Sequence, residues 1–312
     1  MNGAHRPAVL VEAFSDQPFA GNGAAVVHLE QAMSLAWLQS VATSLRQSET
    51  AFLLRASEGW MLRWCTPTCE VPLCGHATLA ALLALGHWGL VEPGDSLVFH
   101  SRSGPLEASL PSGSAGSGAI VLPSAPLQPS RSDGALDAWL RECLGCGLEA
   151  CWTSDLYDVV LLPAEAPLAA ATLPAEALQG HWRRGLVLMQ QVRRGEGVQL
   201  AGSEADYQLR FLAPDLGIPE DPVTGSAHAL VAPWWMERLG RTRLRGWQCS
   251  DRPGGMGCEV LPSGMIRLIG SGHLLWDGAL HTGSRRSAPD PANGSHDSVD
   301  PCDAAWAEWR AA

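Results

Sequence analysis

Two short segments of the same pattern have the residue types needed to hold an anion. Cys74-Gly75-His76 and Thr224-Gly225-Ser226 each place a glycine between two polar side chains, directly before an apolar run that favours a helix. The first N–H groups of a helix have no partner within it, and the helix dipole is positive there, so such a turn can bind a carboxylate. Glycine lets the backbone approach the ligand closely. A single turn of this kind is usually only a helix start, whereas the pair favours a carboxylate-binding site.

These turns belong to a longer internal repeat. Leu62–Pro67 matches Leu209–Pro214, and Pro72–Ala77 matches Pro222–Ala227, at offsets of 147 and 150 residues in a chain of 312. Two matches in the same order indicate a duplication. Each half is expected to offer a strand, a glycine turn and a helix N-terminus, which predicts a site in the cleft between the halves.

The elements that must position these turns are mostly strands. A helix is predicted over 35–46, behind the N-cap residue Ser34, and two more over 78–85 and 227–236. Strands are predicted at 8–14, 51–54, 61–64, 96–100, 119–122, 159–162, 186–191, 207–212, 257–261 and 265–269. They follow one another through Gly/Pro turns, so the pattern indicates an α+β protein with mixed, largely antiparallel sheets. The Ser/Pro-rich segment 123–134 is the best interdomain linker. The Ser/Pro/Asp-rich tail 284–312 is expected to be disordered.

Composition excludes several classes of function. The formal net charge is −11, which argues against nucleic acid or an anionic membrane as a partner. The sequence contains no lysine, so a Schiff base, a pyridoxal-phosphate anchor and the lysine-containing phosphate loop are excluded. The opening MNGAHRPAVLVEAF lacks the basic and apolar parts of a secretory signal, and no apolar run is long enough to span a membrane. We therefore expect a cytoplasmic protein with reduced thiols.

Two groups of cysteines are close enough in the sequence to be compared with metal sites. Cys65, Cys69 and Cys74 lie near His76 in the sequence, and a second group comprises Cys143, Cys146 and Cys151. Their spacings do not match the paired C-x2-C knuckles of structural zinc sites. We expect neither a metal nor an organic cofactor.

Five ordered motifs resemble those of the phenazine-biosynthesis isomerase (PhzF-like) family. They are FAGN (19–22), SETAF (48–52), TPTCEVPLCGHAT (66–78), GIPEDPVTGSAH (217–228) and QCSDRPGG (248–255). The resemblance extends from about Val9 to Leu280 and is weak between 109 and 202. It implies the diaminopimelate-epimerase-like fold, with two similar domains, each a curled mixed, mostly antiparallel sheet around a central helix. We expect these domains at 1–120 and 121–283, with a last strand that returns to the first domain.

The resemblance also implies the site. Glu49 corresponds to the family's acid/base, and His76, Asp221 and Ser226 correspond to the other catalytic residues. Substrate binding is assigned to the backbone and side chains of Asn22, Gly75, Thr224 and Gly225. The implied activity is a proton shift on a small carboxylate-bearing substrate, without metal or cofactor. A homodimer is a further expectation.

The chemistry suits these residue types. One carboxylate can remove a proton from one carbon and return it to another, and enclosure between domains should raise the pKa of Glu49 toward neutrality. His76 and Ser226 can donate to developing negative charge, and Asp221 can pair with a substrate amine. Two alternatives stay open. One is an epimerase or dehydratase that uses Cys74, the position where related enzymes carry a catalytic cysteine. The other is a catalytically silent protein of the same fold that serves interactions. The sequence leaves the substrate unidentified.

Overall fold

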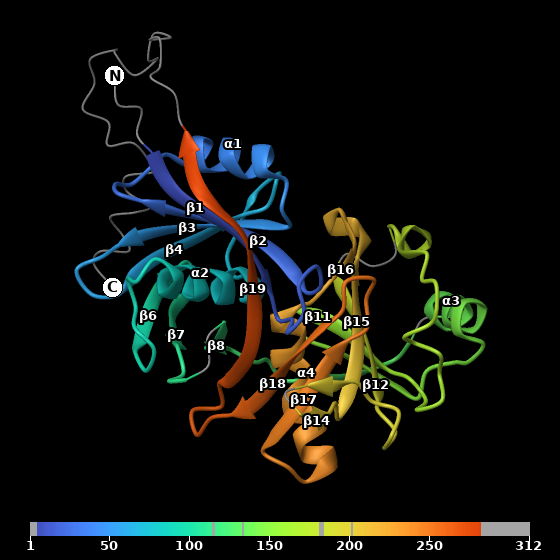
Figure 1. The fold of residues 1–312 in the computed structure, drawn as a ribbon. Coiled ribbons are helices and arrows are strands. Elements are labelled where there is room, and N and C mark those ends of the chain that lie inside the picture. Colours follow the sequence, from blue (N-terminus) through green and yellow to red (C-terminus); the bar gives the residue numbers. More distant parts are fainter. Residues whose placement is uncertain (1–4, 114–115, 133, 181–183, 201, 282–312) are drawn as a thin grey trace.

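The computed structural model describes residues 5–113, 116–132, 134–180, 184–200 and 202–281 (Figure 1). The predicted disordered tail at 284–312 lies outside these residues. No helix within the described ranges is both long and apolar enough to cross a membrane.

The described residues of the N-terminal half form two helices and eight strands. Its elements are β1 (His5–Ala13), β2 (Asn22–Leu29), α1 (Leu35–Leu45), β3 (Glu49–Arg55), β4 (Trp60–Cys65), β5 (Glu70–Val71), α2 (Gly75–His87), β6 (Ser96–Ser101), β7 (Gly104–Ser109) and β8 (Ser117–Leu122). The prediction of a helix behind Ser34 is confirmed, because the Ser34 side chain accepts a hydrogen bond from the backbone N–H of Trp37. That helix ends at Leu45, and the C-cap residue Arg46 adopts a left-handed conformation.

The C-terminal half follows after a short strand and a helix. Its elements are β9 (Gln128–Ser130), α3 (Gly134–Leu144), β10 (Ala150–Thr153), β11 (Tyr157–Leu161), η1 (Ala175–Leu178), β12 (Gly185–Gln191), β13 (Gln199–Leu200), β14 (Ser203–Glu204), β15 (Tyr207–Ala213), η2 (Pro214–Leu216), β16 (Ile218–Asp221), α4 (Gly225–Leu239), β17 (Arg243–Gln248), β18 (Gly254–Val260) and β19 (Ile266–His281). Part of the predicted linker is thus strand, because β9 pairs with β10. Helix α3 was not predicted.

Strand pairing has the same order in both halves. In the first half, β2 pairs antiparallel with β1 and parallel with β3, and β4 pairs antiparallel with β3 and β5 and parallel with β6. In the second half, β11 pairs in the same way with β10 and β12, and β15 pairs in the same way with β12, β16 and β17. A buried arginine–glutamate pair also recurs, with Arg63 on Glu70 and Arg210 on Glu220. The overall class is a mixed α+β fold with extensive sheets.

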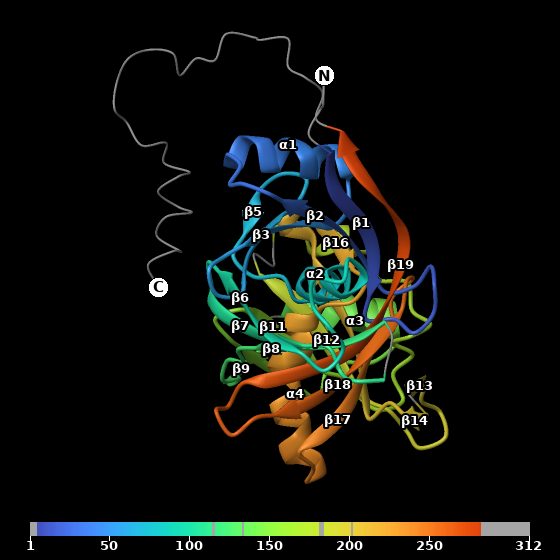
Figure 2. The ribbon, with the colours of Figure 1, turned by 60° about the vertical axis from the view of Figure 1, so that its left-hand side comes forward.

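Each half wraps its strands around one almost fully buried helix. Most residues of α2 and α4 are buried, and the two helices contact each other. Their apolar runs were predicted correctly, although each helix begins earlier than expected, at Gly75 and Gly225. An apolar helix of this kind is stable only inside a core, which explains why the strands curl around it. Figures 1 and 2 show α2 within the upper half and α4 within the lower half.

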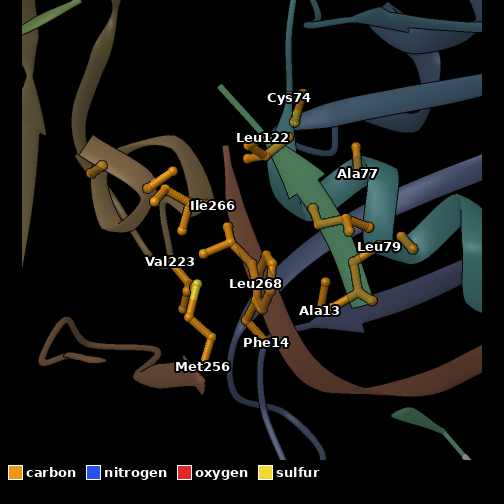
Figure 3. Packing of buried hydrophobic residues seen from close by; sticks show 14 of the residues in the cluster. Ala13, Phe14, Cys74, Ala77, Leu79, Leu122, Val223, Met256, Ile266 and Leu268 are labelled. Carbon is orange, nitrogen blue, oxygen red and sulfur yellow. The ribbon is translucent and has the colours of Figure 1, made fainter. Parts of the chain in front are cut away.

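The long strand β19 connects the two halves. Its first residues pair antiparallel with β18 and with β8, and from Gly272 to His281 it pairs with β1 (Figure 1). Phe14 lies at this crossing, fully buried and with a left-handed φ of 61°. Figure 3 shows its side chain beside Leu268, among apolar residues from both halves. The backbone N–H of Gly255 donates to the carbonyl of Phe14, which fixes the loop before β2 against the second half.

Candidate active site

The two predicted glycine turns meet at the junction between the halves. Gly75 begins α2 and Gly225 begins α4. A Cβ added to Gly75 would lie 3.2 Å from the Cα of Gly225 and 3.1 Å from a methyl group of Leu122. Such contacts are tighter than side chains normally make, so glycine permits this approach. Two helix N-termini, each with unpaired N–H groups and a positive dipole end, therefore converge on one place.

Glu49 and His76 form a buried pair at this junction. Glu49 is the first residue of β3, and its Oε2 lies 3.1 Å from Nε2 of His76, near the start of α2. Both residues are less than a tenth exposed. The hydroxyl of Ser48 lies 3.1 Å from the same imidazole nitrogen. A carboxylate and an imidazole that are far apart in the sequence thus face each other beside the helix N-termini.

Asn22 connects this pair to the second half. Its amide donates to Oδ1 of Asp221 at 2.8 Å and to the carbonyl of Val223 at 3.0 Å. Its Oδ1 accepts from the hydroxyl of Ser48 at 2.9 Å. The amide of Asn22 has two hydrogens, and these two acceptors take both of them. The 3.1 Å contact between the amide nitrogen of Asn22 and Nδ1 of His76 is therefore a close approach and not a third donated hydrogen bond. The expected substrate-binding residue is therefore also the polar link between the halves.

Asp221 and Thr224 form the opposite side of the site. The hydroxyl of Thr224 donates to Oδ2 of Asp221 at 2.6 Å. The buried side chain of Gln248 accepts from the backbone N–H of Thr224 at 2.7 Å and donates to the carbonyl of Asp221 at 2.6 Å. Sequence reasoning missed this role of Gln248, although the residue opens the QCSDRPGG motif. Its two bonds hold the turn before α4 in place.

Ser226 faces a partner that the sequence did not predict. Its Oγ lies 2.8 Å from the phenol oxygen of Tyr157, the first residue of β11. The structure therefore brings Glu49, His76 and Asp221 together around Asn22. Ser226 lies beside them, in contact with Tyr157. Tyr157 comes from the segment where the family resemblance is weak, so no motif pointed to it.

Electrostatics corrects one expectation. Burial raises the pKa of Glu49, but the charge of His76 and hydrogen bonds from His76, Ser48 and Cys74 outweigh it, so the pKa is lowered below its ordinary value. The expected rise toward neutrality is therefore wrong for this state. Burial opposes protonation of His76, yet Cys74 and Glu49 together raise its pKa well above the ordinary value. The pair is thus an ionised carboxylate beside an imidazolium.

Asp221 and Cys74 differ from Glu49 because burial is the dominant effect on the pKa of both groups. Burial raises the pKa of Asp221 to about 6, with Glu49 adding to the rise and His76, Thr224 and Asn22 opposing it. Burial and the carboxylate of Glu49 raise the pKa of the Cys74 thiol to about 11, although His76 opposes this. Cys74 is therefore a neutral thiol near pH 7. The reactive cysteines of enzymes instead have lowered pKa values.

One group of side chains has the spacing of metal ligands. The ligating atoms of Glu49, Cys74 and His76 all lie within 4.8 Å of one another, and within the described ranges no other such set is found. Cys65 and Cys69 of the first cysteine cluster and the three cysteines of the second cluster do not join this set. A metal at this place would compete with the Glu49–His76 pair and would require a thiolate, which the raised pKa of Cys74 disfavours. The donor set fits a metal poorly.

Comparison with known proteins identifies a family and a fold. A family model described as phenazine biosynthesis-like protein (PhzC-PhzF) matches residues 11–266. An uncharacterized isomerase of Pseudomonas aeruginosa is 36% identical over 269 residues, which cover 85% of this chain and 96% of that protein. The crystal structure of a PhzF-family phenazine biosynthesis protein from Enterococcus faecalis matches with a TM-score of 0.77 and 30% identity, covering 89% of this chain and 99% of that one.

A more distant structure shares the fold alone. A hydroxyproline epimerase from Agrobacterium vitis, solved with bound trans-4-hydroxy-L-proline, matches with a TM-score of 0.57 at 10% identity, covering 88% of this chain and 91% of that one. The family model covers most of this chain, and the alignment covers nearly all of the sequence relative. The protein therefore belongs to the phenazine biosynthesis-like (PhzC-PhzF) family, and its fold is the one that epimerases of this type also have.

Proposed function

We propose that this protein is a cofactor-independent isomerase that moves a proton on a small carboxylate-bearing substrate, with Glu49 as the acid/base. The observation that carries the proposal is the buried Glu49–His76 pair, with its 3.1 Å contact beside two converging helix N-termini. The relatives named as isomerases support the reaction class.

The two halves contribute different groups to substrate binding and catalysis. We infer that they arose by duplication, because the strand pairing, the arginine–glutamate pairs and the glycine turns all recur. The N–H groups at Gly75 and Gly225 bind the substrate carboxylate, since helix N-termini hold anions without a basic side chain. Glu49 then stands at one side of the bound substrate, and Asp221 at the other side pairs with an amine where the substrate carries one.

The proton transfer uses one carboxylate twice. Glu49 rests ionised and is thus ready to act as a base. It takes a proton from a carbon next to the carboxylate, the C–H electron pair moves into the substrate, and negative charge grows on the substrate oxygens. The imidazolium of His76 and the helix dipoles stabilise that charge. Glu49 then returns the proton to a second carbon, which completes the isomerisation without a redox change.

Two other readings are less well supported. An epimerase or dehydratase that uses Cys74 needs a thiolate, and the pKa of about 11 opposes it. A catalytically silent protein has no need of a buried cluster of polar side chains, which is costly to desolvate. The cytoplasmic location, the homodimer and the domain limits stay predictions from the sequence.

Replacement of Glu49 by glutamine tests the acid/base role. The amide preserves shape but cannot carry a proton, so turnover should fall by about 10²–10⁴-fold while thermal stability stays close to that of the wild type. Activity is found by incubating a panel of cyclic and amino-acid carboxylates in D2O and measuring incorporated deuterium by mass spectrometry. Glu259→Gln, on strand β18, where the carboxylate pairs with Arg243 and Arg267, is the control and should exchange normally. Near-normal exchange by the Glu49→Gln variant would remove Glu49 from the mechanism.

Replacement of Cys74 by alanine separates the two enzymatic readings. We expect a loss of about 1–2 kcal/mol in the free energy of unfolding, from the lost packing of one sulfur, and less than a tenfold loss of exchange rate. Iodoacetamide should modify Cys74 far more slowly than the exposed Cys69, which serves as an internal reference. A Cys74→Ala variant that folds normally but is inactive would support the thiol mechanism instead.

The raised pKa of Asp221 predicts how stability varies with pH. Because its folded pKa of about 6 lies above the unfolded value of 3.8, its contribution to stability is fully present below pH 4 and is lost as pH rises through 6. Asp221→Asn removes this cost of ionisation. Relative to the wild type, the variant should gain about 1–3 kcal/mol in unfolding free energy between pH 4 and pH 8, measured by urea denaturation. A difference that does not vary with pH would show that Asp221 is not the group that titrates.

A further inference from the structure

Tyr157 is held rigidly where the second half meets the active site. Its phenol oxygen lies 2.8 Å from Oγ of Ser226, and its ring packs edge-on against Phe211 at 4.8 Å between centroids. Ser154 fixes the backbone at this point, because its hydroxyl accepts from the N–H of Tyr157 and donates to the carbonyl of Tyr157. Asp221 and Glu49 are near enough to act electrostatically on the phenol.

The strand registers show which residue of the second half corresponds to Glu49 of the first half. Thr50 pairs with Cys65 in the first half, and Leu186 pairs with Leu212 in the second. Cys65 and Leu212 are matching positions of the internal repeat, so Thr50 corresponds to Leu186. The residue before each is then Glu49 and Gly185 respectively. The second half therefore has glycine at the position where the first half has its acid/base.

Tyr157 occupies the space that this glycine leaves. It pairs directly with Gly185 across the parallel strands, as Ala24 pairs with Glu49 in the first half. A Cβ added to Gly185 would lie 2.9 Å from Cδ1 of Tyr157 and would also clash with the ring of Phe211. In the first half the small residue Ala24 pairs with the large residue Glu49. In the second half the large residue is Tyr157, at the position of Ala24, and the small one is Gly185, at the position of Glu49. A phenol therefore fills the place that a carboxylate has in the first half.

The partners of these groups also correspond. His76 and Ser226 occupy matching positions of the repeat, 150 residues apart. Glu49 contacts His76 in one half, and Tyr157 contacts Ser226 in the other, at 3.1 and 2.8 Å. The second pair is a neutral counterpart of the first, related to it by the internal repeat.

On the basis of the proposed function, we propose that Tyr157 is a positioning residue that orients the Ser226 hydroxyl to donate to an oxygen of the substrate carboxylate. A phenol is a better donor than an alcohol, so Tyr157 donates to Oγ of Ser226 and leaves the serine hydrogen free for the substrate. The substrate oxygen gains charge when Glu49 removes the adjacent proton, so this bond strengthens during the reaction.

The environment keeps the phenol protonated. Burial raises the pKa of Tyr157, and the charges of Asp221 and Glu49 add to the rise. Tyr157 therefore stays a hydrogen-bond donor near neutral pH rather than a second base. This division agrees with a single proton-carrying carboxylate.

Fluorine NMR tests the proposal without a known substrate. The chain has only two tyrosines, so replacement of both by 3-fluorotyrosine gives two signals, assigned through Tyr157→Phe. Titration with benzoate should shift the Tyr157 signal saturably and leave that of the buried Tyr207 in place, whereas benzyl alcohol, which lacks the carboxylate, should shift neither. The benzoate shift should be lost in Ser226→Ala. Absence of a saturable benzoate shift, or a shift that persists in Ser226→Ala, would overturn the proposal.

Kinetic measurements on a carboxylate that exchanges deuterium give a second test of the proposal. Tyr157→Phe should lower kcat about tenfold with little change in KM, because one hydrogen bond that strengthens in the transition state is lost. The double variant Tyr157→Phe/Ser226→Ala should be no slower than Ser226→Ala alone, since Tyr157 acts through the serine. Equal kcat values for Tyr157→Phe and wild type, or additive losses in the double variant, would contradict this role.

The two proposals fail in different ways. If Glu49→Gln retains exchange while the benzoate shift at Tyr157 is present, the acid/base assignment fails and the carboxylate contact stands. If Glu49→Gln is inactive while Tyr157→Phe equals the wild type, the role of Tyr157 fails and the acid/base assignment stands.

Discussion

The close approach of two helix N-termini governs the whole arrangement. Gly75 and Gly225 meet so closely that a Cβ on Gly75 would lie 3.2 Å from the opposing backbone. Each helix is buried within its own half, so both halves must be oriented to let the helices converge. The strand β19 and the buried Phe14 hold the halves in that orientation. A concentrated positive potential results in a chain whose net charge is −11.

A neighbouring charge explains why an ionised carboxylate is stable in this buried place. Burial alone would favour a neutral Glu49, but the imidazolium of His76 reverses the effect and lowers its pKa. Asp221 lies further toward the second half with neutral donors as its partners, and there burial dominates, so its pKa rises to about 6. The same surroundings thus give two carboxylates opposite shifts. Because of that difference, Glu49 is a base at rest, whereas Asp221 is a group that can bind a cation.

The sequence predicted those parts of the structure that depend on local pattern. Apolar periodicity and the repeat located ten strands, both central helices and the glycine turns, because each depends on neighbouring residues. Helix α3 was missed although its apolar spacing is local. The role of Gln248 and the contact of Tyr157 with Ser226 were missed because their partners are distant in the chain. The direction of the Glu49 pKa was wrong for the same reason. It depends on a 3.1 Å contact between a strand and a helix that no local pattern specifies.

Transfer of a label within the substrate tests the central claim most directly. A substrate deuterated at the carbon that loses its proton is converted in H2O, and the product is examined after a single turnover. If one buried carboxylate carries the proton between two carbons, part of the deuterium should appear at the second carbon, on the face from which it was removed. A product that contains only solvent hydrogen, delivered to the opposite face, would show that a second base completes the reaction and would contradict the account.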